Sequence, residues 1–583
     1  MRIALDGEWL FLPDSARGGV EQGWYGEACD RSGWSAVEIP RFWEGYPGLS
    51  AYDGWGWFAR RFVVPRTGEP MSLHFAGVDD DARLWLNGVE AGSHTGYSDP
   101  FTVPAEALRE GENLLVVLVA DHGGGGGIYK PVTLIETRRL EELLRGPLYG
   151  TPARRSADWV KDAVIYQVYL RSFSPEGTFT GLERRLGELK KLGVTVLWLM
   201  PIHPVGAERR KGSLGSPYAV RDFRAVNPEF GTMEDFKRLL NAAHREGLKV
   251  ILDLVINHTS WDNPLLAGHP DWYTRNARGQ VVPPNADWTD VADLDYASPG
   301  LRRSMTEMMR WWVRDVGIDG FRCDVAELVP TDFWEDVRRE LDRIKPVMML
   351  SEGTLPEHHR KAFDLTYSWN IYDALGPLLE GKRPPELLDE IFRAEALQFP
   401  TGSLRMRFNT NHDKNAWDEP AILRYGPPGL KLSAVLVNTI PGVPLLYNGE
   451  EVANDRRLSL FEKVEIDWKR PRTMGDLYGT LFRLRARNKS LSRGEMIRLS
   501  GGGDAQVYAF ARAAGKDRVV VVLNFSAQAR RARVELPESV LRTGRAGTVL
   551  TEVFSGRKLR PAADGLLETD LEPLGYRVYT VSE

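Results

Sequence analysis

Four acidic side chains, each in or directly after an apolar run of strand length, carry the chemistry that this sequence offers. They are Asp253, Asp324, Glu352 and Asp413, in the segments DLVINH, GFRCDVAE, MLSEG and FNTNHD. Their spacing suits strand-plus-helix units of a parallel barrel, with one unit skipped before the last acid. Carboxylates at the carboxyl ends of barrel strands indicate catalysis, because that face of the fold carries the chemistry. Together with an arginine and two histidines, and without a cofactor motif, they point first to hydrolysis of glycosidic bonds.

The segment that must position these acids alternates strand and helix patterns from residue 159 to about residue 496. Helical periods such as EDFKRLLNAAHREG between apolar runs predict a parallel sheet wrapped by helices, an α/β fold of the (β/α)8 TIM-barrel type. Helix starts are signalled by Thr232 before Asp235 and by Ser298 before Pro299. The barrel strands are expected at 164–169, 194–200, 250–255, 320–324, 347–352, 363–366, 404–409 and 443–446.

Strand patterns return on both sides of the barrel. Residues 1–136 contain short alternating strands such as SLHFAG and ARLWLNG, which predict an N-terminal β-sandwich. A linker is expected at 137–158 and a C-terminal β-sandwich at 497–583. Within the barrel, residues 258–298 show no clear helix and are too long for an ordinary loop, so we expect a small inserted excursion domain beside the cleft.

Composition excludes several classes of protein. The net charge of −5 and pI near 6.2 leave no basic field for nucleic acid or an anionic membrane. Only Cys29 and Cys323 occur, so no disulfide framework is expected, and no metal-ligand spacing is evident. We find no signal segment and no apolar run of membrane-spanning length. The sequence as it stands predicts a cytoplasmic protein, or a secreted or periplasmic one if a signal was removed.

Strand geometry places two candidate residues on one side of their strand. Arg322 and Asp324 are two positions apart in GFRCDV, so they should point the same way. Cys323 is then expected to be a small core residue and not a reactive thiol. The residues expected to face the opposite side, toward the helices, are Phe321, Cys323 and Val325.

Each candidate taken alone also has a purely structural interpretation. Asp324 could be an ion-pair partner of Arg322, and Glu352 could cap the loop that follows it. His258 and His412 could be core histidines with satisfied hydrogen bonds. Only their joint occurrence in a strand context favours catalysis.

With these motifs in place, the chain resembles the alpha-amylase superfamily of retaining glycoside hydrolases. The resemblance covers about residues 159–491 and extends more loosely to the C-terminus. It rests on six segments in the family's order, a pattern far more specific than any one of them. The segments are SPY at 216–218 with FGT at 230–232, DLVINH at 253–258, GFRCD at 320–324, Glu352, NHD at 411–413 and GVPLLYNGEE at 442–451.

The resemblance implies three acids in different roles. Asp324 corresponds to the nucleophile, and Arg322 would keep it ionised and oriented. Glu352 corresponds to the residue that acts first as acid and then as base. Asp413 corresponds to the third acid, which binds ring hydroxyls and helps to distort the sugar.

The resemblance also implies which residues hold the substrate. His258 and His412 would hydrogen-bond hydroxyls of the same sugar, and Tyr218 would stack beneath it. Asp253 and Asn257 would support the site, with Asp253 positioning the arginine. Asn257 matches a residue that often ligates calcium in the family, but no calcium loop is evident. No cofactor is therefore expected, and a calcium ion is compatible with the sequence but not predicted.

The implied function is hydrolysis of α-1,4-glucosidic bonds in starch or malto-oligosaccharides. A cyclomaltodextrinase- or neopullulanase-type hydrolase or transglycosylase is the alternative, because AEL at 326–328 resembles that branch. NHDKNAWDEP and RLSLFEKVEIDW are more similar to ordinary bacterial alpha-amylases. An alternative of another class is a catalytically inactive, glycan-binding protein of amylase fold. It would require the loss of at least one of three acids, all of which are present.

The N-terminal segment resembles the jelly-roll sugar-binding domain of β-galactosidases and β-glucuronidases. GEWLFLPD, ARLWLNGVEAG and GGIYKPV carry this resemblance. It implies an architectural or homodimer role before a starch-binding role, although Trp55 and Trp57 could touch long glucans. The apolar residues of the linker predict that this domain packs on the barrel and is not held on a free tether.

Overall fold

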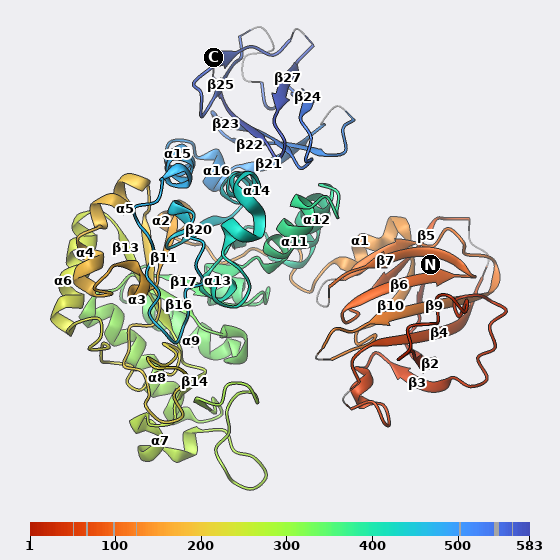
Figure 1. Ribbon diagram of the computed structural model, residues 1–583, viewed down its shortest axis with the longest axis horizontal. Coiled ribbons are helices and arrows are strands. Elements are labelled where there is room, and N and C mark those ends of the chain that lie inside the picture. Colours follow the sequence, from red (N-terminus) through yellow and green to blue (C-terminus); the bar gives the residue numbers. More distant parts are fainter. Residues whose placement is uncertain are drawn as a thin grey trace. The chain divides into compact units, whose positions relative to one another are not determined.

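The chain forms two compact units, Met1–Gly146 and Pro147–Glu583 (Figure 1). The computed structural model describes every residue except 51, 66–67, 97–99, 124, 501–502, 542–546, 563 and 583. Each unit has its own hydrophobic core. No helix among the described residues combines the length and the apolar character that crossing a membrane would require.

A closed barrel of eight parallel strands forms the centre of the second unit. All eight strands lie where the apolar runs predicted them, so the predicted fold class is confirmed. In barrel order they are β11 (Ile165–Val168), β12 (Val196–Leu199), β13 (Lys249–Leu254), β16 (Gly320–Cys323), β17 (Met348–Ser351), β18 (Leu365–Tyr367), β19 (Leu404–Arg407) and β20 (Val443–Tyr447).

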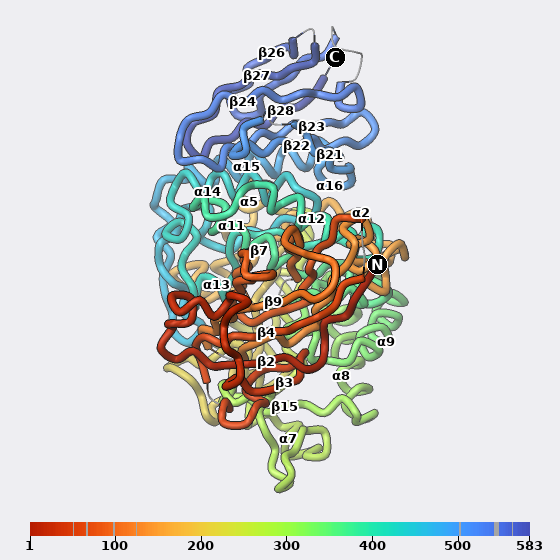
Figure 2. The backbone as a smooth tube through the Cα atoms, turned by 90° about the vertical axis from the view of Figure 1, so that its right-hand side faces the viewer, coloured from red at the N-terminus to blue at the C-terminus, as the bar shows by residue number. Residues whose placement is uncertain are grey.

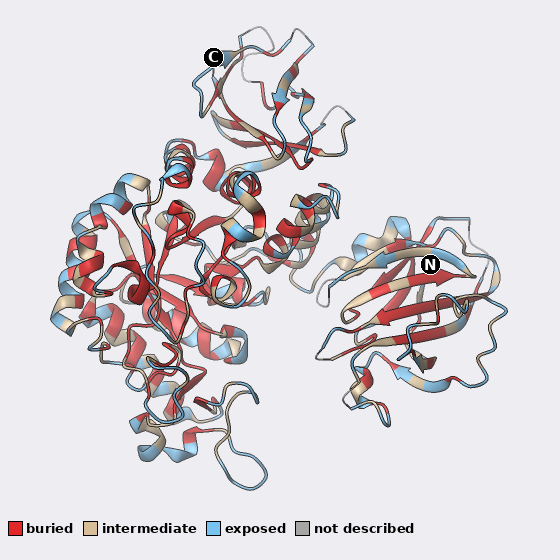
Figure 3. Ribbon diagram, in the orientation of Figure 1, coloured by how far each residue is buried: buried red, intermediate tan, exposed pale blue. Residues whose placement is uncertain are grey.

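The barrel strands are buried on both faces, and helices cover the outside (Figure 3). Alternate residues divide between two cores. Ile251 fills the barrel interior, while its neighbour Leu252 packs outward against the helices. The covering helices include α5 (Leu186–Leu192), α6 (Met233–Arg245), α8 (Pro299–Trp311), α9 (Thr331–Asp342), α11 (Trp369–Leu379), α12 (Leu387–Gln398), α14 (Ala421–Thr439) and α15 (Thr473–Arg487).

Two of these helices begin where the sequence predicted. Thr232 and Asp235 form a capping box at the start of α6, in which each side chain bonds the other's backbone N–H. Ser298 caps α8 by accepting the Leu301 N–H, and Pro299 follows as the first helical residue. Both predicted helix starts are confirmed.

A small excursion lies between β13 and α8, at the place predicted for it. Its two strands, β14 (His258–Ser260) and β15 (Val291–Asp293), pair antiparallel. Between them are a short helix, α7 (Pro264–Gly268), and a 3₁₀ turn, Pro270–Trp272. The sequence did not predict α7, because one turn with a proline at its start has no amphipathic period to read.

The C-terminal part of the second unit is built on a six-stranded antiparallel sheet that also packs against the barrel helices (Figure 2). Tyr508 and Phe510 join the core that includes the barrel helices, whereas Ala509 and Ala511 join a separate core under a two-stranded sheet. One strand therefore serves two cores. The strands are β21 (Glu495–Leu499), β22 (Val507–Ala514), β23 (Asp517–Asn524), β28 (Tyr576–Ser582), β25 (Val549–Glu552) and β26 (Lys558–Leu559), with β24 (Arg530–Glu535) and β27 (Leu566–Leu571).

The first unit contains two antiparallel sheets around one core, and a second core in this unit contains Trp57. Trp57 is fully buried and donates its indole N–H to Asp14 at 3.0 Å, so the expectation that Trp57 could touch glucans is wrong. The sheets are β1 (Arg2–Ala4), β10 (Val132–Glu136), β5 (Met71–Phe75) and β8 (Phe101–Pro104), and β3 (Ser35–Ile39), β2 (Gly7–Pro13), β4 (Trp55–Val64), β9 (Gly111–Ala120), β6 (Asp81–Leu86) and β7 (Val89–His94).

The predicted linker divides between the two units. Residues 137–146 belong to the first unit and include a short helix, α1 (Leu140–Leu144). Beyond them, the chain is already attached to the barrel unit. The backbone of Thr401 accepts the Ala153 N–H at 2.9 Å and donates to Thr151 at 2.8 Å.

Candidate active site

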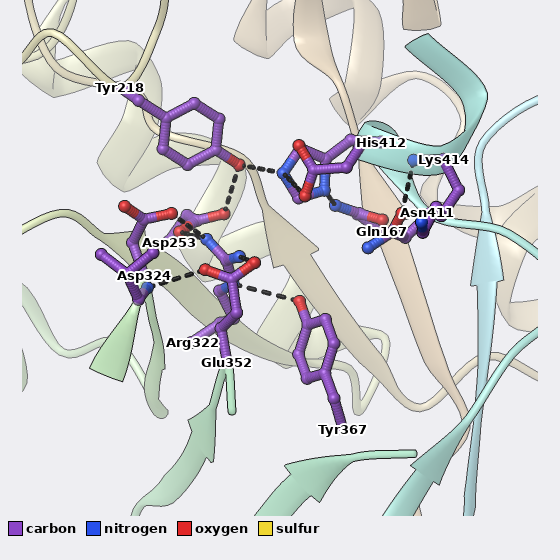
Figure 4. Close-up of polar contacts among 12 residues, drawn as sticks. Gln167, Tyr218, Asp253, Arg322, Asp324, Glu352, Tyr367, Asn411, His412 and Lys414 are labelled. Carbon is purple, nitrogen blue, oxygen red and sulfur yellow. Dashed lines mark hydrogen bonds and ion pairs between the residues drawn. The ribbon is translucent and has the colours of Figure 1, made fainter. Parts of the chain in front are cut away.

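Arg322 lies at the centre of a cluster of carboxylates at the carboxyl ends of the barrel strands (Figure 4). Its Nη1 lies 2.6 Å from Oδ1 of Asp253 and 2.8 Å from Oδ1 of Asp324. Its Nη2 lies 2.8 Å from Oε1 of Glu352. The structure therefore brings three acids from three neighbouring strands, β13, β16 and β17, onto one guanidinium.

Three aromatic rings enclose this arginine. The Arg322 guanidinium lies 5.2 Å from the ring centre of Trp198 and 5.8 Å from those of Tyr218 and Tyr367. Its Nε also donates to the Tyr367 hydroxyl at 3.1 Å. Cation–π contacts of this kind are strongest where water is excluded, and Arg322 is fully buried. The cation is therefore fixed in the barrel and cannot turn away from its acids.

Asp253 is bound at both of its oxygens. Oδ1 faces Arg322, and Oδ2 accepts hydrogen bonds from Trp198 Nε1 and the Tyr218 hydroxyl, each at 3.1 Å. Burial raises the pKa of Asp253 to about 6, against the opposing charge of Arg322. A carboxylate held at both oxygens and removed from solvent suits the supporting position that the sequence predicted for it.

A chain of hydrogen bonds links β11 to Asp253. Gln167 Nε2 lies 2.7 Å from Nδ1 of His412, and His412 Nε2 lies 2.5 Å from the Tyr218 hydroxyl. Burial lowers the pKa of His412 well below its usual range, so the ring is neutral. Because Gln167 donates to Nδ1, the ring proton lies on Nε2 and is donated to Tyr218, which in turn donates to Asp253. The partners thus fix the tautomer of His412.

Asp324 and Glu352 differ in their surroundings. Burial raises the pKa of Asp324 well above its usual range, although Arg322 opposes the shift. Glu352 keeps 16% of its side chain exposed, and its Oε2 accepts the Val325 N–H at 2.7 Å.

The backbone turns at Val325, two residues after the end of β16 at Cys323, and Val325 has a φ of 36°. The strand alternation therefore stops before Val325, and the prediction that Val325 faces the helices is wrong, while Cys323 does pack in the helix-facing core.

The loops after β16 and β17 are tied together beside Glu352. Glu327 Oε1 accepts the N–H groups of Thr354 and Leu355, the latter at 2.8 Å. A Cβ on Gly353 would lie 2.4 Å from Cγ of Glu327, and Gly353 has a φ of 155°. Only glycine fits there. Glu327 therefore holds the turn that carries Glu352.

Asp413 enters the site from the short helix that follows β19. This helix, α13 (His412–Trp417), is capped by Asn411, whose side chain accepts the Lys414 N–H at 2.9 Å. Asp413 Oδ2 lies 3.3 Å from His412 Nε2, and its negative charge acts on Asp324. Burial raises the pKa of Asp413 as well. The helix start thus places a fourth carboxyl beside the other three.

The excursion contributes His258 at the edge of the site. Burial lowers the pKa of His258 to about 4, and the ring bonds the backbone of Tyr218. Its edge faces Trp288, with ring centres 5.5 Å apart. Nδ2 of the neighbouring Asn257 lies 3.4 Å from Nδ1 of His258. The backbone carbonyl of Asn257 accepts the Leu294 N–H. Among the described residues, no three His, Cys, Asp or Glu side chains converge so as to hold a metal ion.

The structure brings all nine predicted site residues to one region and adds three residues that the sequence did not indicate. Gln167, Trp198 and Tyr367 bind the predicted residues directly. Gln167 carried a usable signal, because a polar side chain inside a buried parallel strand must find a partner. Trp198 and Tyr367 carried none, because aromatic residues are common in barrel interiors for packing alone.

The balance of charge limits what this site can do. Four carboxyl groups surround one guanidinium, and burial raises the pKa of three of them. Like charges at such short range cannot all ionise together. The site can therefore hold at least one ionised carboxylate and one protonated carboxyl at once, which is the pairing that a nucleophile and a general acid require.

Comparison with known proteins gives consistent matches. A model described as the alpha-amylase catalytic domain matches residues 153–362, and one described as the maltogenic amylase C-terminal domain matches residues 502–578. The chain is 29% identical over 505 residues to alpha-amylase MalA of Haloarcula japonica, covering 82% of this chain and 71% of that protein. It is 27% identical over 465 residues to neopullulanase 2 of Thermoactinomyces vulgaris, covering 68% and 74%.

A solved structure extends this similarity. The maltogenic alpha-amylase AmyB from Thermotoga neapolitana is 31% identical to this chain, with a TM-score of 0.67. The match covers 73% of this chain and 99% of that one.

Proposed function

The chain belongs to the alpha-amylase superfamily of glycoside hydrolases, and on that premise we propose that it cleaves α-1,4-glucosidic bonds of starch or malto-oligosaccharides by double displacement. The observation that carries this proposal is the position of Asp324 and Glu352 on two nitrogens of the same guanidinium. Two carboxyl groups held this close suit a retaining mechanism, in which they lie about 5 to 5.5 Å apart.

In the first step, the carboxylate of Asp324 attacks the anomeric carbon while Glu352 gives its proton to the departing glycosidic oxygen. One bond forms between carbon and the Asp324 oxygen, and the bond between carbon and the leaving oxygen breaks. Arg322 stabilises the ionised form of Asp324, because a charge-assisted contact at 2.8 Å favours the carboxylate.

In the second step, Glu352 takes a proton from water, and the water oxygen attacks the anomeric carbon. The bond to Asp324 breaks, the sugar leaves with its original configuration, and both carboxyl groups return to their starting states. Glu352 takes the base role here because it is the more exposed of the two acids that contact Arg322 at the ends of β16 and β17, so water can reach it.

Asp413, His258, His412 and Tyr218 hold the sugar in this proposal. Asp413 binds ring hydroxyls and favours the flattened ring of the transition state. Tyr218 offers its ring face to the sugar, since its hydroxyl is already held by Asp253 and His412. The neutral form of both histidines suits hydrogen bonds to uncharged hydroxyl groups.

A cyclomaltodextrinase or neopullulanase activity is a second candidate. Two observations favour this second candidate. The chain is similar to neopullulanase 2. It also carries Glu327 in the segment where many alpha-amylases have a Lys-His pair. Product analysis on soluble starch, cyclodextrin and pullulan separates the two candidates. We expect maltose or short malto-oligosaccharides from starch, and exclusive cleavage of sucrose, trehalose or isomaltose would refute α-1,4 specificity. A reducing-sugar assay that detects no hydrolysis would favour a binding protein without catalysis.

A further inference from the structure

Trp417 and Phe461 form an aromatic pair at the outer end of the helix that carries Asp413. We propose that this pair is a binding platform for a glucose unit of the α-glucan, at a distance from the bond that is cleaved. This inference rests on the proposed function and adds a subsite that would make the enzyme favour long chains over short ones.

The exposure of Trp417 is the first observation. Trp417 is 60% exposed, a fraction that only Val63 exceeds among the large hydrophobic side chains of the described residues. Its ring centre lies 5.9 Å from that of Phe461, with the planes 64° apart, an edge-on contact. Exposing so much apolar surface is unfavourable in water, and the cost falls when another apolar face covers it.

The position of Trp417 is the second observation. Asp413 and Trp417 are four residues apart on α13. Side chains four apart lie on the same face of a helix, one turn from each other. A glucan that is bound at Asp413 and continues along this face therefore reaches Trp417.

The platform is held rigidly. Asp418, the residue after Trp417, accepts hydrogen bonds from the Tyr372 hydroxyl at 3.1 Å and from Arg424 at 3.2 Å. Asn415 is buried and accepts the Leu458 N–H at 2.7 Å, which ties α13 to the segment that carries Phe461. A rigid aromatic surface loses little conformational entropy on binding.

The same segment continues toward the proposed sugar pocket. The carbonyl of Phe461 accepts the Leu214 N–H at 3.1 Å, and Glu462 accepts the Ser213 N–H at 2.8 Å. Leu214 lies four residues before Tyr218. The platform and Tyr218 are therefore connected through one pair of loops.

The chemistry around the platform favours an uncharged ligand. Asp418 also pairs with Lys414, at 3.4 Å, so its carboxylate is already engaged by two cations and is not free to bind a charged ligand. The apolar C–H face of a glucose ring can cover the Trp417 ring, while its hydroxyl groups stay in water. Tryptophan suits a partner that is apolar on one side and wet on the other.

The test compares substrates of two lengths. For Trp417→Ala, we expect the ratio of kcat/KM on maltoheptaose to kcat/KM on maltotriose to fall about tenfold. Trp417→Phe keeps a smaller ring and should fall between wild type and Trp417→Ala. Phe554→Ala is the matched control, because Phe554 is an exposed aromatic residue of the C-terminal sheet region, and its ratio should equal that of wild type.

A binding measurement separates this inference from the proposed function. In an Asp324→Asn background, adding Trp417→Ala should raise the Kd for maltoheptaose about tenfold by calorimetry. A wild-type enzyme that cleaves neither substrate would overturn the proposed function, while the calorimetry would still test the platform. An unchanged ratio with an unchanged Kd would overturn the platform. So would a change only in oligomeric state, which would make this surface a contact with a second copy of the chain.

Discussion

Nη1 of Arg322 lies 2.8 Å from Oδ1 of Asp324, and the two residues stand two positions apart at the end of one strand. Their side chains point the same way because alternate residues of a strand share a face. This pair follows from the β16 backbone, which Asp324 continues by one residue while its N–H bonds the carbonyl of Leu254 on β13 at 2.9 Å. The candidate nucleophile is therefore positioned by the most rigid part of the barrel.

Removal of either central acid should abolish activity. For Asp324→Asn and Glu352→Gln, we expect kcat on starch to fall by at least about 10³-fold, because each carboxyl acts in both chemical steps. Both changes are nearly isosteric, so circular dichroism spectra should match that of wild type. A folded variant that keeps more than a few per cent of the wild-type rate would mean that the roles are assigned to the wrong residues.

The Tyr218 hydroxyl should matter separately from its ring. In Tyr218→Phe, the His412 N–H and Asp253 each lose a buried partner, so we expect a loss of stability of about 1 to 3 kcal/mol. We also expect a lower kcat/KM, because His412 is no longer oriented. Urea unfolding and initial rates measure the two effects.

Tyr447→Phe is the matched control for Tyr218→Phe. Tyr447 ends β20, and its buried hydroxyl has no hydrogen-bond partner among the described residues. Its removal should cost little or nothing. Equal losses in the two variants would contradict the hydrogen-bond chain as the cause.

Asp253 should make stability depend on pH in the direction opposite to an ordinary salt bridge. Its pKa is raised from 3.8 to about 6 in the folded chain, so the folded chain holds this proton more tightly than the unfolded chain does. The resulting stabilisation is complete below about pH 4 and is lost as pH rises to about 6. Between these limits, wild type should lose about 2 to 3 kcal/mol relative to Asp253→Asn. Unfolding by urea at several pH values measures the difference.

An exposed aspartate provides the control for that experiment. Asp336→Asn on α9 should follow the wild-type dependence on pH, because the Asp336 side chain is 58% exposed. If Asp253→Asn also runs parallel to wild type from pH 4 to pH 6, the buried proton is not on Asp253.

The barrel and its acids could be predicted because each depends on a short stretch of sequence. The apolar runs fix the strands, and period two then fixes the direction of Arg322 and Asp324. The packing of Cys323 toward the helices follows from the same alternation. The alternation does not extend to Val325, because the strand ends one residue after Arg322 and Val325 itself has a positive φ.

Contacts between distant segments could not be predicted in this way. Gln167 and His412 are 245 residues apart, and nothing in either local sequence specifies their hydrogen bond. Trp57 was misjudged for a similar reason. A tryptophan in a strand can face either side of a sheet. Only the folded structure shows that other side chains cover the face of β4 that carries Trp57.

The most direct test of the central claim is to trap the covalent intermediate. Glu352→Gln should still accept an activated substrate such as maltotriosyl fluoride, because fluoride leaves without a proton from the enzyme. It should then hydrolyse the intermediate slowly, because no base activates water. We expect mass spectrometry of the digested protein to find the sugar attached to the peptide at Asp324. A labelled peptide that carries the sugar elsewhere, or unlabelled protein with products of inverted configuration, would contradict double displacement through Asp324.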